Sequence, residues 1–270
     1  MKFRYASDCH THSACSPDGN QPPEEMLARA QALGLWAYAL TDHCECNQYW
    51  EQYQHRANRA WEAMGRFQAP AGLWFLRGVE LGQPLQNREG AEEVLARHSY
   101  DYVIGSVHNL WGKEDFYFLR YKEMPMERIH GLLREYWQEI LETIGWGGFD
   151  SLGHLTYPLR YMQGEAGVVV DLAPHQEAID EIFRALIRGE KALEINTSGL
   201  RQKIGQTLPS LPLVRRYREL GGRLVTLGSD AHDVSDLGKG IEEGMELLQA
   251  AGFQEFAVYR NRRPVMLPLE

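Results

Sequence analysis

The chain has 270 residues, of which 44% are hydrophobic and 24% charged, a composition typical of a soluble globular protein with a sizeable core. Its formal net charge of −9 argues against an extensive nucleic-acid-binding surface, and no apolar run approaches the roughly 18 residues of a membrane span. The first residues lack the apolar segment of a secretory signal, so we expect a cytoplasmic protein with neither nucleic acid nor membrane as a partner.

The chain starts with a short strand that ends in an H-x-H pair, His10 and His12. Because side chains alternate along a strand, both imidazoles point the same way and can bind one cation. A turn at residues 16–20 places Asp18 on a loop beside this pair. An aspartate that only stabilises the turn is the alternative there. Residues 22–33 then predict a helix, with prolines at its start.

Six further strands each end close to a polar marker residue. They cover residues 36–40, 73–79, 102–107, 151–153, 192–195 and 223–227, and their markers are His43, Glu80, His108, His154, Asn196 and Asp230. Between and after them we expect helices at residues 47–67, 126–144, 174–188, 209–220 and 241–248, and a small hairpin from residues 256–259 and 264–267. Successive markers are 28 to 46 residues apart, which suits repeated units of strand and helix.

The carboxyl ends of parallel strands face one rim of an α/β fold. We therefore expect one cavity to contain the metal-ligand types at these ends, with Asp18 on an adjoining loop: His10, His12, His43, Glu80, His108, His154, Asp230 and His232. This recurrence indicates a site for several metal ions rather than scattered core histidines. The other histidines lack this context and are interpreted as structural or surface residues: His55, His98, His130 and His175.

Six motifs, in this order and spacing, resemble the PHP (polymerase and histidinol phosphatase) superfamily. They are H-T-H-S at 10–13, T-D-H at 41–43, G-V-E at 78–80, G-S-V-H at 105–108, G-H-L at 153–155 and G-S-D-A-H at 228–232. The segments N-T-S-G at 196–199, D-L-G-K-G at 236–240 and N-R-R-P at 261–264 are similar to its monofunctional histidinol-phosphate phosphatase branch. The resemblance implies one domain over residues 1–270, an α/β fold built as a distorted (β/α)7 TIM-like barrel.

The resemblance also implies a trinuclear metal site at the C-terminal rim of the strands. The implied ligands are His10, His12, Glu80 and Asp230 for the first ion, His108, His154 and a shared Glu80 for the second, and Asp18, His43 and His232 for the third. Many relatives have a histidine where this chain has Asp18. Sites with mixed nitrogen and oxygen ligands suit zinc, iron(II) and manganese(II), and any of these could be the divalent metal at the three positions.

The activity implied is that of a histidinol-phosphatase, which hydrolyses the small-molecule phosphate monoester L-histidinol phosphate to L-histidinol and phosphate in histidine biosynthesis. A hydroxide that bridges two ions would attack the phosphorus, and the third ion would neutralise phosphate oxygens. Glu80, Asp230 and His232 are the catalytic candidates. Either Asp230 or a metal-bound water would protonate the leaving alkoxide.

Further residues near the strand ends are candidates for binding the substrate. Arg160 and Arg201 can each clamp phosphate with a planar fork, and surface solvation is their alternative role. Ser198 is a third candidate for phosphate. The candidates to stack on the imidazole are Trp111, Tyr117 and Tyr161, and those to bind the amine are Glu114 and Asp115.

Three other functions are weighed against this one. A different PHP hydrolase would act on nucleotide or nucleic-acid phosphodiesters, an option weakened by the acidic charge balance. A non-catalytic, metal-stabilised scaffold would be expected to have lost ligands, and none is missing here. An amidohydrolase-type barrel typically has a carboxylated lysine at a strand end, where this sequence offers none. The sequence carries no signal for oligomeric state.

Overall fold

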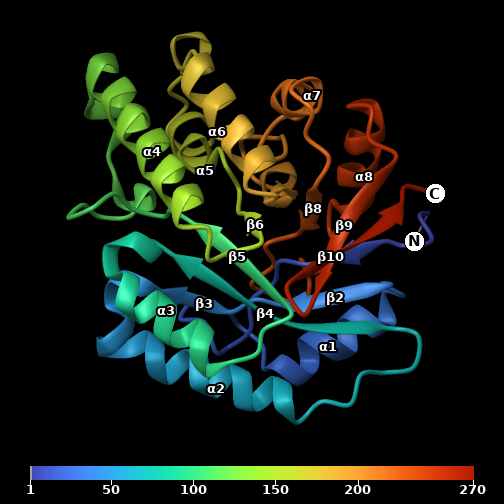
Figure 1. Ribbon diagram of the computed structural model, residues 1–270. Coiled ribbons are helices and arrows are strands. Elements are labelled where there is room, and N and C mark those ends of the chain that lie inside the picture. The colour runs from blue at the N-terminus through green and yellow to red at the C-terminus, as the bar shows by residue number, and fades with distance from the viewer. Residues whose placement is uncertain (1) are drawn as a thin grey trace.

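The computed structural model describes residues 2–270; Met1, which the expected domain includes, lies outside them. Within the described residues, eight strands form one parallel sheet (Figure 1). Seven of them follow the order β1-β2-β4-β5-β6-β7-β8, and the eighth, β3, pairs with the end of β4. The strands are β1 (Ser7–Asp8), β2 (Ala37–Leu40), β3 (His43–Glu45), β4 (Trp74–Gly82), β5 (Tyr102–Ser106), β6 (Ser151–Leu152), β7 (Ala192–Asn196) and β8 (Val225–Gly228).

Backbone hydrogen bonds join the two edges of this sheet into a barrel. Cys9 N donates to Leu227 O at 3.0 Å, and Asp230 N donates to His10 O at 2.8 Å. The predicted distorted (β/α)7 barrel is therefore confirmed. The first strand is shorter than the sequence suggests, because its regular pairing with β2 ends at Asp8 and only Thr11 pairs again, with Ala231.

Helices cover the outside of the sheet, α1 to α3 on one side and α4 to α8 on the other (Figure 1). They are α1 (Pro23–Ala32), α2 (Gln54–Gly65), α3 (Arg88–Arg97), α4 (Met126–Trp146), α5 (Tyr157–Leu159), α6 (Gln176–Arg188), α7 (Leu211–Glu219) and α8 (Ile241–Ala250). Short 3₁₀ turns are η1 (Cys46–Gln48), η3 (Pro84–Asn87), η4 (Phe116–Phe118), η5 (Tyr121–Glu123), η7 (Ala173–His175) and η8 (Ser198–Arg201), and the π turns are η2 (Tyr49–Tyr53) and η6 (Arg160–Glu165).

The apolar stripes read from the sequence face the core. On α6, Ile179, Ile182, Phe183 and Leu186 are all fully buried. Each such side chain contributes roughly 1.5–3 kcal/mol through the apolar surface that it removes from water. On α4, Ile129, Leu133, Ile140 and Ile144 are buried, whereas Met126 at its start is exposed, and α4 packs on α6. These helices hold the strand ends in register, and so they fix the positions of the site residues.

The structure differs from the predicted helices at two places. The helix expected over residues 47–67 is a 3₁₀ turn, a π turn and then α2, and the π turn buries both Tyr49 and Tyr53 in the interior. The helix α3 was not predicted at all. Its start is marked by Asn87, whose side chain accepts a hydrogen bond from Gly90 N, a capping signal that the sequence does offer.

The chain ends with the predicted hairpin, β9 (Glu255–Arg260) and β10 (Arg263–Pro268), which pair antiparallel. The first described residues lie beside the C-terminal end of the chain (Figure 1), where Arg4 N donates to Glu270 O at 2.9 Å. Between residues 2 and 270, no helix combines the length and the apolar character needed to cross a membrane.

Candidate metal centre and active site

The nine residues predicted to bind metal lie together at the carboxyl end of the barrel. His10 and His12 follow β1, Glu80 lies in β4 and Asp230 follows β8, and none of the four is more than 5% exposed. They adjoin a cavity of about 800 Å³. The wall of this cavity includes the other five predicted ligands, Asp18, His43, His108, His154 and His232.

The first predicted ligand set has the spacing of ligands around one ion. His10 Nε2 lies 3.3 Å from Glu80 Oε2, and His12 Nε2 lies 3.4 Å from Asp230 Oδ1. The two diagonal distances, from His12 to Glu80 and from His10 to Asp230, are 3.6 and 3.7 Å. A tetrahedral zinc ion with ligands at about 2.1 Å separates neighbouring ligand atoms by about 3.4 Å. The four side chains therefore fit a divalent cation.

Three polar atoms that face this cation position are also unpaired. Among the described residues, Nε2 of His10, Nε2 of His12 and Oε2 of Glu80 are buried and have no hydrogen-bond partner. One unpaired buried polar atom costs about 1–3 kcal/mol. Three that converge on one point are explained by a bound cation, and imidazole with carboxylate suits a divalent transition metal.

The second predicted set shares Glu80 through its other oxygen. Glu80 Oε1 lies 2.9 Å from His154 Nε2 and 3.2 Å from His108 Nε2, and the two imidazole nitrogens are 3.3 Å apart. The hydroxyl of Ser106 donates to the same carboxylate oxygen at 2.6 Å. A single buried carboxylate thus faces two candidate cation positions.

The third predicted set lies at the mouth of the cavity. Asp18 Oδ2 is 3.2 Å from His232 Nε2 and 3.6 Å from His43 Nε2, and the two histidine nitrogens are 3.4 Å apart. The side chain of Asp18 is 55% exposed, whereas that of His43 is 12% exposed. This position is therefore the one most open to solvent, in keeping with the loop position expected for Asp18.

The carboxylates concentrate negative charge in this buried region. Burial alone would raise the pKa of Glu80, but His10 and His43 hold it well below its ordinary value. Burial and the neighbouring imidazoles of His43 and His232 lower the pKa of His12. Burial would likewise raise the pKa of Asp230, and His10 keeps it low. Divalent cations bound here would add positive charge beside these carboxylates.

Glu194 is a functional residue that the sequence reasoning missed. It is buried in β7, and its Oε1 lies 2.6 Å from His10 Nδ1, so the opposite nitrogen of His10 faces the first cation position. Its Oε2 accepts from His154 N at 2.7 Å. The available signal was its place two residues before Asn196, which puts both side chains on the same face of the strand.

Asp42 organises the loop that carries His12, and it was also missed. Its carboxylate accepts from Ser13 N at 2.7 Å and from the Ser16 hydroxyl at 2.7 Å, while Ser16 Oγ lies 3.4 Å from His12 Nδ1. Burial raises the pKa of Asp42, and these hydrogen bonds oppose that rise. The T-D-H motif therefore supplies a loop anchor at Asp42 as well as a candidate ligand at His43.

The two candidate phosphate clamps occupy different environments. Arg160 lines the cavity and donates through Nη2 to Ser198 Oγ at 2.6 Å and to Asp230 Oδ2 at 3.0 Å. Its buried Nε has no hydrogen-bond partner among residues 2–270. Arg201 donates to the backbone oxygens of Ser229 and Asp230 at 2.7 and 2.9 Å. The structure thus places Arg160 and Ser198 together beside the predicted ligands. Arg201 instead uses both of its Nη atoms to hold the backbone at Ser229 and Asp230, where the φ angle of Asp230 is +53°.

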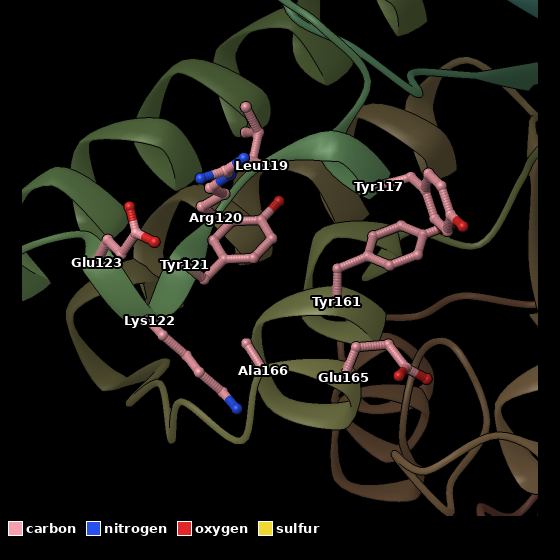
Figure 2. A pocket seen from close by; sticks show the side chains of 9 residues that line it. All are labelled: Tyr117, Leu119, Arg120, Tyr121, Lys122, Glu123, Tyr161, Glu165 and Ala166. Carbon is pink, nitrogen blue, oxygen red and sulfur yellow. The ribbon is translucent and has the colours of Figure 1, made fainter.

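The aromatic candidates do not all reach the cavity. Tyr117 and Tyr161 line it with their ring centroids 5.5 Å apart, and Figure 2 shows the ring of Tyr161 pointing toward Tyr117 in a pocket next to the cavity. Trp111 is 68% exposed and is not among the lining residues. Glu114 and Asp115 both line the cavity, and Asp115 Oδ1 accepts from the Tyr157 hydroxyl at 3.0 Å.

The remaining histidines lie away from this cavity. His98 Nε2 is 2.9 Å from Asn58 Oδ1 and its ring stacks on Trp61, while His130 Nδ1 is 2.8 Å from His175 Nε2. These contacts agree with the structural roles expected for them.

The PHP domain matches residues 8–198, which is more than half of the chain. The chain belongs to the PHP domain family. This PHP protein is 31% identical over 252 residues to a Thermotoga maritima protein named probable histidinol-phosphatase, with 93% of this chain and 94% of the relative covered. It is 28% identical over 264 residues to the histidinol-phosphatase of Lactococcus lactis, with 95% of each chain covered.

A crystal structure has the same fold as this PHP protein. It is a histidinol phosphate phosphatase from Lactococcus lactis, in complex with zinc, L-histidinol and phosphate. The superposition has a TM-score of 0.75 at 25% sequence identity and covers 96% of this chain and 98% of the other. The similarity therefore extends over the whole barrel, including β7, β8 and the helices beyond residue 198.

Proposed function

We propose that this PHP protein is a metal-dependent phosphomonoesterase that hydrolyses L-histidinol phosphate to L-histidinol and phosphate, within one catalytic barrel domain. The observation that carries the proposal is the convergence of nine metal-ligand side chains, bridged by Glu80, beside the buried guanidinium of Arg160. The relatives named histidinol-phosphatase and the Lactococcus lactis complex with zinc, L-histidinol and phosphate support this choice of substrate.

We assign three divalent cations to the site. His10, His12, Glu80 and Asp230 would hold the first, Glu80, His108 and His154 the second, and Asp18, His43 and His232 the third. When bound, such cations supply an activated water for attack on phosphorus and positive charge for the phosphate oxygens. Zinc is supported by the Lactococcus lactis structure, while iron(II) and manganese(II) suit the same ligands.

Arg160 is the residue best placed to bind the phosphate group. Burial would lower its pKa, but the Asp230 carboxylate raises it, so the guanidinium stays charged. Its contacts to Ser198 and Asp230 fix the plane of the fork, and its unpaired Nε can donate to a phosphate oxygen. Charge-assisted hydrogen bonds of this kind contribute about 1.5–3 kcal/mol each.

Glu80, Asp230 and His232 remain the proposed catalytic residues, because they border the place where phosphate would meet the cations. Their own contacts show how that place is kept rigid. Asn196 Nδ2 donates to Asp230 Oδ2 at 3.3 Å, and the Asp230 carbonyl lies 3.1 Å from His232 Nδ1. These contacts orient both side chains before a substrate arrives.

For the rest of the substrate we propose that Tyr117 and Tyr161 contact the imidazole and that Asp115 or Glu114 meets the amine. All four line the same cavity as Arg160. Burial raises the pKa of Asp115, while His108 and the hydrogen bond from Tyr117 N oppose this rise. A substrate ammonium would complete the pairing of that carboxylate.

The test is phosphate release by the zinc-loaded protein from histidinol phosphate, from other phosphate monoesters and from a dinucleotide, with metal content measured on each sample. We expect kcat/KM for histidinol phosphate to exceed that for the other monoesters by about 100-fold, because site groups left unpaired by the wrong substrate are costly. Chelation should remove the activity and zinc should restore it. Preferred turnover of the dinucleotide, or no turnover of any ester by the loaded protein, would refute the proposal.

A further inference from the structure

Glu45 is a buried carboxylate beside the predicted ligands. It ends β3 two residues after His43, so both side chains lie on the same face of the strand. Its side chain is 13% exposed and lines the cavity. Glu45 Oε1 lies 3.1 Å from His108 Nδ1, with which it forms a hydrogen bond, and 3.3 Å from His43 Nδ1.

The two histidines that Glu45 touches belong to different predicted cations. His108 directs Nε2 toward Glu80 and His154, and His43 directs Nε2 toward Asp18 and His232. His108 thus uses Nε2 for a cation position and Nδ1 for the hydrogen bond to Glu45, whereas Nδ1 of His43 lies between Glu45 and Glu80. His43 Nδ1 also lies 2.8 Å from Glu80 Oε2, without the geometry of a hydrogen bond to either carboxylate.

The position of the Glu45 carboxylate is set from two further sides. Gln83 Nε2 donates to Glu45 Oε2 at 2.7 Å, and Gln83 Oε1 accepts from His108 N at 3.0 Å. Gly82 pairs with Glu45 across the two strands, and a Cβ at Gly82 would overlap the Glu45 carboxylate. The carboxylate therefore occupies the space that a side chain at residue 82 would fill.

We infer that Glu45 is a positioning residue that holds His108 through a hydrogen bond and packs against Nδ1 of His43, so that Nε2 of each imidazole is directed at the second or the third cation position and one carboxylate couples the affinity of both. An acceptor on the far nitrogen fixes the imidazole tautomer and its orientation, and removing such an acceptor typically weakens metal binding by about 10–100-fold. The inference rests on the proposed metal-dependent function.

Glu45→Ala removes the acceptor, and we expect the holoenzyme to lose two of its three cations at about 10–100-fold lower chelator concentration than the unmodified protein. The first cation is expected to stay, because the partners of Glu45 are His108, His43 and Gln83. Glu45→Gln keeps one oxygen that can accept from His108 Nδ1, so its loss is expected to be smaller.

Gly82→Ala provides an independent test, since it keeps the Glu45 carboxylate but displaces it. The three atoms nearest to the added Cβ all belong to the flexible end of Glu45, so the strand itself can accommodate the methyl group. We expect this variant to lose the same two cations as Glu45→Ala. Glu51→Ala removes an exposed glutamate of η2 and serves as the matched control, with unchanged retention.

The measurement is zinc retained per chain by elemental analysis, after the zinc-loaded holoenzymes are dialysed against increasing EDTA, with circular dichroism as a check of the fold. Retention in folded Glu45→Ala or Gly82→Ala equal to that of the unmodified protein would overturn the inference, as would equal loss of all three cations. If Glu45→Ala does not fold, zinc retention in Gly82→Ala and Glu45→Gln still tests whether Glu45 supports the second and third cations. Because no substrate is present, this result is independent of which ester the enzyme hydrolyses.

Discussion

His10 and Glu194 form a buried pair in which Nδ1 of the imidazole lies 2.6 Å from a carboxylate oxygen. Both side chains are at most 1% exposed. The pair lies behind the first predicted cation position and leaves His10 Nε2 as the nitrogen that faces Glu80 and Asp230. Gly228 allows this approach, because a Cβ there would overlap both His10 and Glu194.

Replacing Glu194 by glutamine tests this arrangement. The amide keeps the shape of the side chain but is a weaker acceptor for His10, and we expect kcat to fall by about 10–100-fold with KM little changed. Steady-state kinetics of the zinc-loaded variant, compared with the unmodified enzyme, measure the effect. A variant with unchanged kcat and unchanged zinc affinity would show that His10 does not depend on Glu194.

Glu80→Ala tests the bridging carboxylate. It removes an oxygen from each of two proposed cation positions, since Oε2 faces His10 and Oε1 faces His154. We expect phosphate release to fall below detection and the variant to contain fewer metal ions per chain. Elemental analysis with an activity assay on the same sample measures both, and near-normal turnover would argue strongly against the assignment.

The sequence predicted the cluster of metal-ligand residues because all parallel α/β barrels share one geometric feature. Parallel strands present their carboxyl ends at one rim, so residues as distant in sequence as His12 and Asp230 lie 3.4 Å apart. It did not single out Glu194 and Glu45, although each lies two residues from a marker residue on the same face of its strand, because the partner of such a carboxylate is known only once the neighbouring strands are placed. Trp111 is exposed and is not among the residues that line the cavity, and the direction of such a loop side chain depends on contacts that periodicity does not reveal.

Arg160→Ala tests the phosphate clamp. The substitution removes a charged donor from the cavity and the contacts to Ser198 and Asp230, so we expect KM for histidinol phosphate to rise by about 10–100-fold. The fall in kcat is expected to be smaller. Initial rates over a range of substrate concentrations separate the two constants, and Arg29→Ala, which removes an exposed cation of α1, is the control. A KM equal to that of the unmodified enzyme would show that Arg160 does not bind the substrate.

His98 makes stability depend on pH. Burial and the nearby Arg97 lower its pKa in the folded protein, whereas the unfolded chain retains the ordinary value of about 6.5. Below that value the unfolded state binds more protons, so the contribution of His98 is fully present above about pH 6.5 and is lost as the pH falls from there through the lower pKa of the folded state. Urea unfolding of the unmodified protein and His98→Gln between pH 5 and about 8 should give a difference that shrinks toward acid pH. A difference independent of pH would contradict this.

Tyr117→Ala, compared with Trp111→Ala, tests which aromatic residue contacts the imidazole of the substrate. Tyr117 lines the cavity next to Tyr161, whereas Trp111 lies outside its lining, although both are more than 60% exposed. An aromatic pair contributes about 0.5–1.5 kcal/mol beyond the area that it buries, so we expect KM for histidinol phosphate to rise about 3–10-fold in Tyr117→Ala alone. Glycerol phosphate, which has no ring, should show no difference between the two variants. An equal effect on both substrates would mean that Tyr117 shapes the cavity without recognising the imidazole.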